Sequence, residues 1–72
     1  MIQKALGKRV AELRKAKGLS QEELAEKAGY SVEFISLVER GVNAPAVAGL
    51  QKIAKALRVE VKDLFDFGKG AK

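Results

Sequence analysis

Signals that end one helix and begin the next lie only two residues apart at two places in this 72-residue chain. Gly18 and Gly29 suit the left-handed conformation that often follows a helix. Ser20 and Ser31 suit the cap of the next helix, and Ser20 also begins an S-x-x-E capping box that ends at Glu23. Helices joined so closely must cross at a steep angle, so the segment 21–40 is restricted to a tight corner of two short helices.

The rest of the chain also has helical periodicity. Ile2, Leu6, Val10 and Leu13 recur at steps of four, four and three, which predicts a helix over residues 2–16 with one buried stripe. Further helices are expected from residue 21 to about 28, from residue 32 toward the end of the corner at residue 40, over about 46–57, and as a short helix within residues 58–67. Their expected inward residues are Leu24, Ala25, Ala28, Ile35, Val38, Val47, Leu50, Ile53, Ala54, Leu57, Val59, Leu64 and Phe65. We therefore predict an all-α fold, a compact bundle of five short helices.

The composition excludes most enzyme chemistry. The chain has no cysteine and no histidine, so disulfides and metal sites or catalysis based on these residues are ruled out. Asp63 and Asp66 are the only aspartates, and their pattern is that of ordinary surface charges. We expect no enzymatic activity, no cofactor, no metal and no small-molecule ligand.

The length allows one domain, which we assign to residues 1–67, followed by a flexible basic tail over 68–72. No apolar run approaches the roughly 20 residues of a membrane-spanning helix, and the N-terminus lacks the apolar stretch of a secretory signal. We expect no membrane association. A cytoplasmic protein, nucleoid-associated if it binds DNA, is the expectation.

Positive charge is unevenly distributed along the chain. The formal net charge is +5, to which residues 1–18 contribute +5, residues 19–41 contribute −3 and residues 42–72 contribute +3. The basic character that would attract a polyanion therefore lies outside the predicted corner.

The segment SVEFISLVERG has five bulky apolar residues in its first eight positions. At about 100° per residue, Ile35 and Val38 point to the core and Phe34 lies at its margin. Val32 and Leu37 are then expected to face solvent or a partner. Isolated exposed apolar residues are common in proteins, so simple exposure remains an alternative.

These features together resemble the helix-turn-helix of the phage-repressor and Cro family. The resemblance continues through ERG, the proline that follows, LQKIAKALRV and DLF to about Phe65. It implies a repressor-like fold in which the second and third helices form the helix-turn-helix. The corner residues that carry it are Gln21, Ala25, Gly29, Ile35 and Val38.

The resemblance implies contacts with DNA phosphates at both ends of the corner. Ser20 and Gln21 would lie at a helix N-terminus, whose free N–H groups and dipole attract an anion. Arg40 and Asn43 match the turn after the recognition helix, where the family meets the DNA backbone. Ordinary surface roles for Gln21, Arg40 and Asn43 remain alternatives.

The third helix resembles the recognition helix that enters the major groove. Its outward residues Val32, Glu33, Ser36 and Leu37 would approach base edges. Apolar side chains can pack on thymine methyl groups, Glu33 can accept from cytosine N4, and Ser36 can bond a base or a phosphate. The family often has amides or arginine at these positions and this chain does not, which argues against strong purine readout by these side chains. A separate alternative is that Glu33 repels phosphates or lies outside the groove.

Arg14 and Glu39 resemble a partly buried salt bridge that ties the first helix to the third; two independent surface charges are the alternative. Two positions depart from the family pattern. Ala46 stands where a serine or threonine usually caps the fourth helix, which leaves Asn43 as a possible substitute cap. Gly49 lies inside that helix, either because a neighbour approaches closely or by drift.

Three functions are weighed. The first is sequence-specific binding of double-stranded DNA by a homodimer, in a repressor-like transcriptional regulator. The second is a protein-binding module of the same fold, of the antitoxin or adaptor type, which the net charge of −3 in the corner favours. The third, an enzyme, has no supporting residues. Val61 and Phe67 near the chain end give a weak dimer signal.

Overall fold

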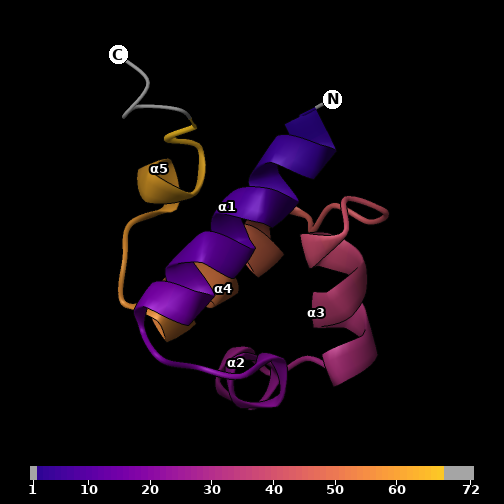
Figure 1. The fold of residues 1–72 in the computed structure, drawn as a ribbon, viewed down its shortest axis with the longest axis vertical. Helices are drawn as coiled ribbons and strands as arrows, with labels where there is room; N and C mark the ends of the chain where they lie inside the picture. Colours follow the sequence, from indigo (N-terminus) through magenta and orange to yellow (C-terminus); the bar gives the residue numbers. More distant parts are fainter. Residues whose placement is uncertain (1, 68–72) are drawn as a thin grey trace.

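The computed structural model describes residues 2–67, which form five helices around one core (Figure 1). The predicted tail over 68–72 lies outside the described residues. In the described part of the chain, no helix combines the length and apolar character needed to cross a bilayer. The helices are α1 (Ile2–Ala16), α2 (Gln21–Ala28), α3 (Val32–Glu39), α4 (Val47–Leu57) and α5 (Val61–Leu64). The all-α prediction and its helix order are confirmed.

The local signals at the corner form the caps that the sequence predicts. The Ser20 hydroxyl accepts a hydrogen bond from the Glu23 N–H, and the Glu23 carboxylate accepts one from the Ser20 N–H. Gly29 ends α2 with φ of 79°, and Ser31 caps α3 by accepting from the Phe34 N–H. Figure 1 shows α2 end-on while α3 runs up the view, so the two helices cross steeply.

The core lies where α1, α2, α3 and α4 meet, and α5 closes it at one end. The Arg9 side chain donates to the main-chain oxygen of Asp63 at 2.9 Å, which links α1 to α5. Among the described residues, the buried apolar side chains are Leu6, Val10, Leu24, Ala25, Ala28, Ile35, Val38, Ile53, Ala54, Leu57 and Leu64.

Three residues expected in the core are instead exposed. Ile2 and Val47, the first residues of α1 and α4, have exposed fractions of 63% and 72%. Burial of a stripe residue depends on whether another element covers its side chain, which periodicity within one helix does not reveal. Phe65 is 38% exposed and forms an edge-to-face pair with Phe67, while Leu64 fills the core position.

Two glycines inside helices allow close contact between elements. A Cβ at Gly7 of α1 would lie 2.2 Å from the main-chain oxygen of Val38, so the two helix backbones touch there. A Cβ at Gly49 of α4 would lie 2.5 Å from the Tyr30 hydroxyl. Close approach of a neighbour is therefore the reason for Gly49.

We predict that Gly7→Ala destabilises the domain. Alanine gains about 1 kcal/mol in helix propensity. Overpacking typically costs about 1–3 kcal/mol, and the cost here is expected at the upper end, because the atoms that a Cβ would meet are all main-chain atoms of Val38 and Glu39, and α3 must shift away from α1. Urea unfolding measures the change as a lower midpoint. Gly49→Ala is the control and is expected to cost less, because the outer end of Tyr30 can move aside. A Gly7→Ala midpoint equal to or above the wild type contradicts the close crossing.

Candidate nucleic-acid interface

The outer side of α3 presents most of the side chains expected to read bases. Glu33 is exposed, and Ser36 and Leu37 are half-buried. Leu37 does not pack against the buried core cluster in the described chain. These three side chains therefore share an accessible face of mixed acidic, hydroxyl and apolar character.

Val32 differs from the sequence-based expectation that it faces outward. It is half-buried and packs against the core cluster, as Phe34 does. Only residues 29–31 separate α2 from α3, so the first turn of α3 stays close to its neighbours. A helical wheel treats α3 alone and misses this coverage. Val32 thus contributes to packing of the core, and less of its side chain is available to a partner than a fully outward position would leave.

The N-terminus of α2 adjoins this face and offers polar donors. Ser20 uses its hydroxyl oxygen as the acceptor in the capping box, which leaves its own O–H free to donate. The Gln21 Nε2 donates to Glu39 Oε1 at 2.9 Å. An amide nitrogen has two hydrogens, so the second remains available. Glu39 therefore holds the Gln21 amide in one orientation at the α2 N-terminus.

Glu39 is also the partner of Arg14, as the resemblance implied. Arg14 Nε lies 2.6 Å from Glu39 Oε2, and Arg14 Nη2 donates to the other carboxylate oxygen at 3.2 Å. The two side chains are only 11% and 6% exposed. Arg14 donates further to the main-chain oxygen of Leu19 at 2.8 Å. The pair therefore connects α1, the start of α2 and the end of α3.

The turn after α3 is fixed by main-chain bonds and by α1. The Val42 and Asn43 N–H groups both donate to the Leu37 carbonyl, at 2.9 and 3.3 Å. Gly41 has φ of 79°, and a Cβ there would lie 2.9 Å from the Lys4 Cα. Arg40 and Asn43 are exposed on this turn.

Asn43 does not replace the missing serine or threonine cap. Ala46 stands at the N-cap of α4, and no side chain makes a cap hydrogen bond there. Asn43 is therefore not diverted to capping.

The residues predicted to contact phosphates and those predicted to read bases lie at neighbouring parts of the molecule. The α2 N-terminus, the outer side of α3 and the turn over 40–43 are joined through Glu39 and the Leu37 carbonyl. Sequence reasoning missed two contributions: the bond from Gln21 to Glu39, and the support of Gly41 by Lys4. Their only signals were a lone glutamine and a glycine in an expected loop. Within residues 2–67 there is no cluster of acidic, cysteine or histidine side chains suited to a metal ion.

The steep corner and its accessible outer face define a helix-turn-helix domain. Residues 10–64 match the model of the helix-turn-helix family. Because the match covers most of the chain, the chain belongs to this family.

Related proteins agree with this assignment. An uncharacterized HTH-type transcriptional regulator, y4dJ of Sinorhizobium fredii, is 40% identical over 63 residues, which are 88% of this chain and 82% of that protein. The HTH-type transcriptional regulator SinR of Bacillus subtilis is 40% identical over 62 residues, 85% of this chain. The match covers 56% of SinR, so the chain spans little more than half the length of that relative.

Solved structures show the same fold. The restriction-modification controller protein C.AhdI of Aeromonas hydrophila aligns with a TM-score of 0.86 and 41% identity over 88% of this chain and 96% of that chain. A structure of the master regulator for biofilm formation SinR, in complex with DNA, aligns with a TM-score of 0.79 and 40% identity. That alignment covers 85% of this chain and 98% of the SinR chain.

We predict that Glu39→Ala strongly destabilises the domain. It leaves the Arg14 guanidinium buried without its carboxylate and releases the Gln21 amide, a loss of about 3–5 kcal/mol for a buried pair. The urea midpoint and the melting temperature measure it. Glu12→Ala is the matched control, because Glu12 pairs with Arg9 at 3.6 Å on the surface, where a pair contributes about 1 kcal/mol or less. Equal midpoints for the two variants contradict the role given to Glu39.

Proposed function

We propose that this chain is a sequence-specific DNA-binding domain of a repressor-like transcriptional regulator, with α3 in the major groove. The proposal is supported by the bonds that join the α2 N-terminus, α3 and the turn over 40–43 through Glu39 and the Leu37 carbonyl. The fold's alignment with SinR, solved in complex with DNA, supports it. A DNA-binding regulator of this kind works in the cytoplasm at the nucleoid.

Phosphate contacts position the domain. The first N–H groups of α2 have no partner within their helix, and the helix dipole favours an anion there. Ser20 and the free hydrogen of the Gln21 amide add donors, and Arg40 and Asn43 contact the backbone on the other side of the groove. Such contacts release counterions, so affinity falls steeply as salt rises.

Base contacts come from the middle of α3. Leu37 packs on a thymine methyl group, Ser36 donates to or accepts from a base edge, and Glu33 accepts from cytosine N4. Val32 contributes a smaller surface because its other side packs in the core. The absence of amide and arginine side chains at these positions leaves a larger share of specificity to DNA shape.

The bound form is a homodimer on two half-sites about one helical turn apart. Exposed aromatic surface near α5 supports this arrangement, since Phe65 and Phe67 form an edge-to-face pair and are both partly exposed. Val61 is half-buried at the same end. A two-fold contact there covers apolar side chains that the monomer leaves exposed.

A protein-binding module of the same fold is the second candidate. The segment 19–41 has a net charge of −3, and no arginine lies on the outer side of α3 within that helix. An acidic, partly apolar face suits a basic protein partner. If a pull-down returns one stoichiometric protein while no DNA is enriched, this candidate replaces the first.

Selection of bound duplexes from a random DNA library tests the proposal, and Leu37→Arg sharpens it. The variant is expected to keep its helical content and urea midpoint, because Leu37 lies outside the core. It is expected to select a different base at one position of each half-site, and to bind the wild-type sequence about 1–3 kcal/mol more weakly.

Val32→Arg serves as the structural control. It is expected to lower the urea midpoint, because the arginine would replace a side chain that packs on the core. The proposal fails if the library yields no enriched sequence at low salt, or if Leu37→Arg selects the same sequence with the same affinity.

A further inference from the structure

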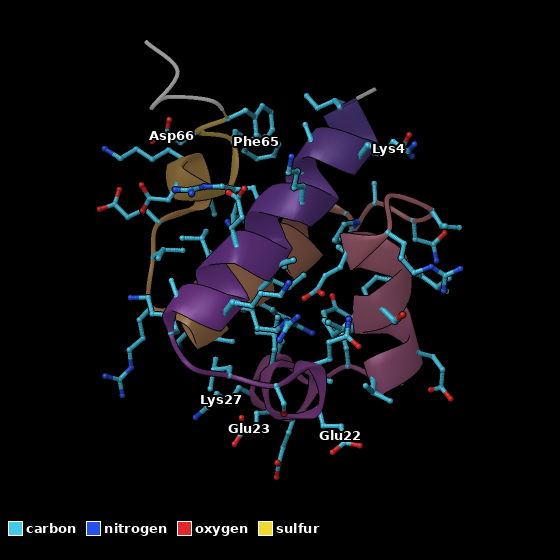
Figure 2. All side chains as sticks on the ribbon, in the orientation of Figure 1. Lys4, Glu22, Glu23, Lys27, Phe65 and Asp66 are labelled. Carbon is cyan, nitrogen blue, oxygen red and sulfur yellow. The ribbon has the colours of Figure 1, made fainter. Side chains whose placement is uncertain are left out.

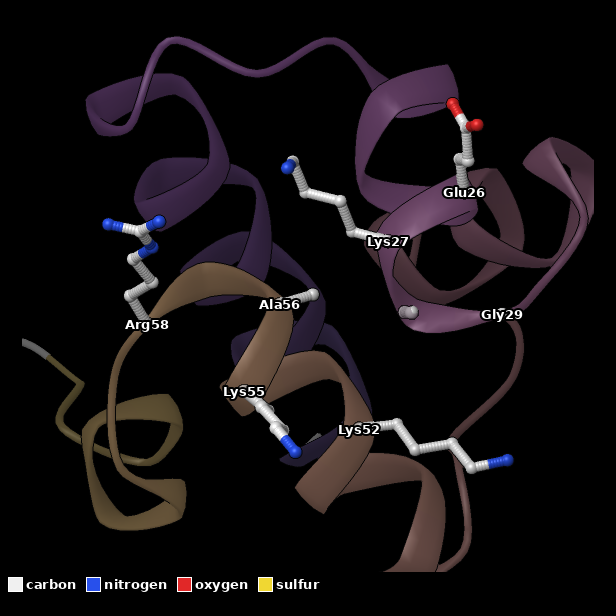
Figure 3. Close-up of a pocket in the computed structure, with 8 residues that line it drawn as sticks. Glu26, Lys27, Gly29, Lys52, Lys55, Ala56 and Arg58 are labelled. Atoms are coloured by element: carbon white, nitrogen blue, oxygen red, sulfur yellow. The ribbon is translucent and has the colours of Figure 1, made fainter.

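A strongly basic concave surface lies away from the outer side of α3. Lys27 of α2, Lys52 and Lys55 of α4, and Arg58 after α4 line a hollow of about 520 Å³ (Figure 3). We call these four residues and the space between them the basic hollow. Glu26 is its one acidic lining residue. The hollow therefore has a formal net charge of +3 from side chains of two segments, residues 26–29 at the end of α2 and residues 52–58 of α4 and its C-cap.

The cations of the basic hollow have no recorded ion pair in the described part of the chain. Lys27 and Lys55 lie in the last turns of α2 and α4, where the negative ends of the helix dipoles partly offset their charge. The ion pairs recorded among residues 2–67 involve Arg9, Arg14 and Lys62, and none involves these four residues. Lys52 lies over the Tyr30 ring with its Nζ 5.7 Å from the ring centre. A neighbouring hollow shares Lys27 and Arg58. That hollow adds Lys17, so the positive strip continues to the end of α1.

The lining suits phosphate groups and lacks the features that bind bases or apolar anchors. Its remaining residues are small: Ala28, Gly29 and Ala56. Small residues let a bulky backbone approach closely. Among residues 2–67, no aromatic or large apolar side chain lines the hollow, whereas bases are usually held by stacking and protein partners by buried aromatic or aliphatic anchors.

Arg58 adds an observation of another kind. It is the only described non-glycine residue with positive φ, at 61°, where it ends α4. Glycine or asparagine is the usual residue at such a position, because a Cβ is unfavourable there. A charged side chain at a strained position points to a use for that charge. Arg58 lies at the end of α4 and lines the basic hollow together with the three lysines (Figure 3).

The basic hollow stays open when DNA occupies the face of α3. α2 packs against α3 on one side and α4 on the other, while α3 and α4 have little contact. Figure 2 places Glu22 on the side of α2 toward α3 and Lys27 on the opposite side. A duplex that contacts α3 and the α2 N-terminus therefore lies on the other side of α2 from the hollow.

We propose that the basic hollow binds the sugar-phosphate backbone of a second DNA duplex, without sequence preference, while the face of α3 holds the specific site. This inference rests on the proposed function, because DNA binding by α3 makes phosphate the anion at highest local concentration. Affinity comes from counterion release by the four cations. One bound regulator can then join two segments of DNA.

A capture experiment on beads tests the inference. Beads carry the library-selected duplex in slight excess over protein, so that it occupies the α3 faces. No free copies are added, because they would compete for the hollow. A labelled duplex of unrelated sequence is then added over a range of salt concentrations. The wild type is expected to capture it, with log capture falling linearly with log salt.

The variants separate the hollow from general charge effects. Lys52→Gln with Lys55→Gln should reduce the salt slope by about 1.8, or about 0.9 for each lost phosphate contact. The control, Lys8→Gln with Lys62→Gln, removes the same charge outside the hollow and should leave capture unchanged. Arg58→Gly should reduce the slope by about 0.9 while raising the urea midpoint, so its loss of capture cannot reflect unfolding.

Each other outcome overturns the inference. In one such outcome the wild type captures no labelled duplex. In another, the Lys8 and Lys62 control loses as much capture as the Lys52 and Lys55 variant. In a third, the protein captures labelled poly-glutamate in place of the duplex. Loss of affinity for the selected duplex in the Lys52 and Lys55 variant would place the hollow within the specific site. If no selected duplex retains the protein, the proposed function fails. Direct titration with an unrelated duplex then tests whether the hollow binds DNA. Equal affinities of the wild type and the Lys52 and Lys55 variant would reject that binding.

Discussion

The contact between α1 and α3 determines where every outward side chain of α3 points. At Gly7 the two backbones meet without an intervening side chain, and the Arg14–Glu39 pair fixes the end of α3 against α1. A one-residue rotation of α3 would turn its outer residues by about 100°. The outer side of α3 is accessible because the contact with α1 fixes the rotation of α3 about its own axis.

The same carboxylate that anchors α3 also orients a polar group at the start of α2. Glu39 accepts from Arg14 and from Gln21, so packing and the polar face share one residue. A buried ion pair contributes more to a unique geometry than to net stability in some proteins. Here that geometry fixes the position of the α2 N-terminus relative to α3. Simultaneous contact of both elements with one DNA groove would depend on this relative position.

Local signals made most of the fold predictable from the sequence. The serine caps and the glycines at 18 and 29 fix the helix ends, because each acts through bonds within a few residues. Exposure of Ile2, Val47 and Phe65, and the partial burial of Val32, were not predictable, because they depend on which other element covers each position. Gly7 gave no signal of its own, since a glycine inside a helix reveals a close neighbour only once the packing is known. The bond from Gln21 to Glu39 joins residues 18 apart and likewise depends on the corner.

In the proposed function, the α2 N-terminus, the outer side of α3 and the turn over 40–43 form one DNA-contacting face. Amide chemical-shift changes in the labelled protein, on addition of the library-selected duplex at equal concentration, test it most directly. The largest changes are expected at Ser20, Gln21, Ser36, Leu37 and residues 40–43. Largest changes on α5 or around the basic hollow, with those of α3 unmoved, would contradict it.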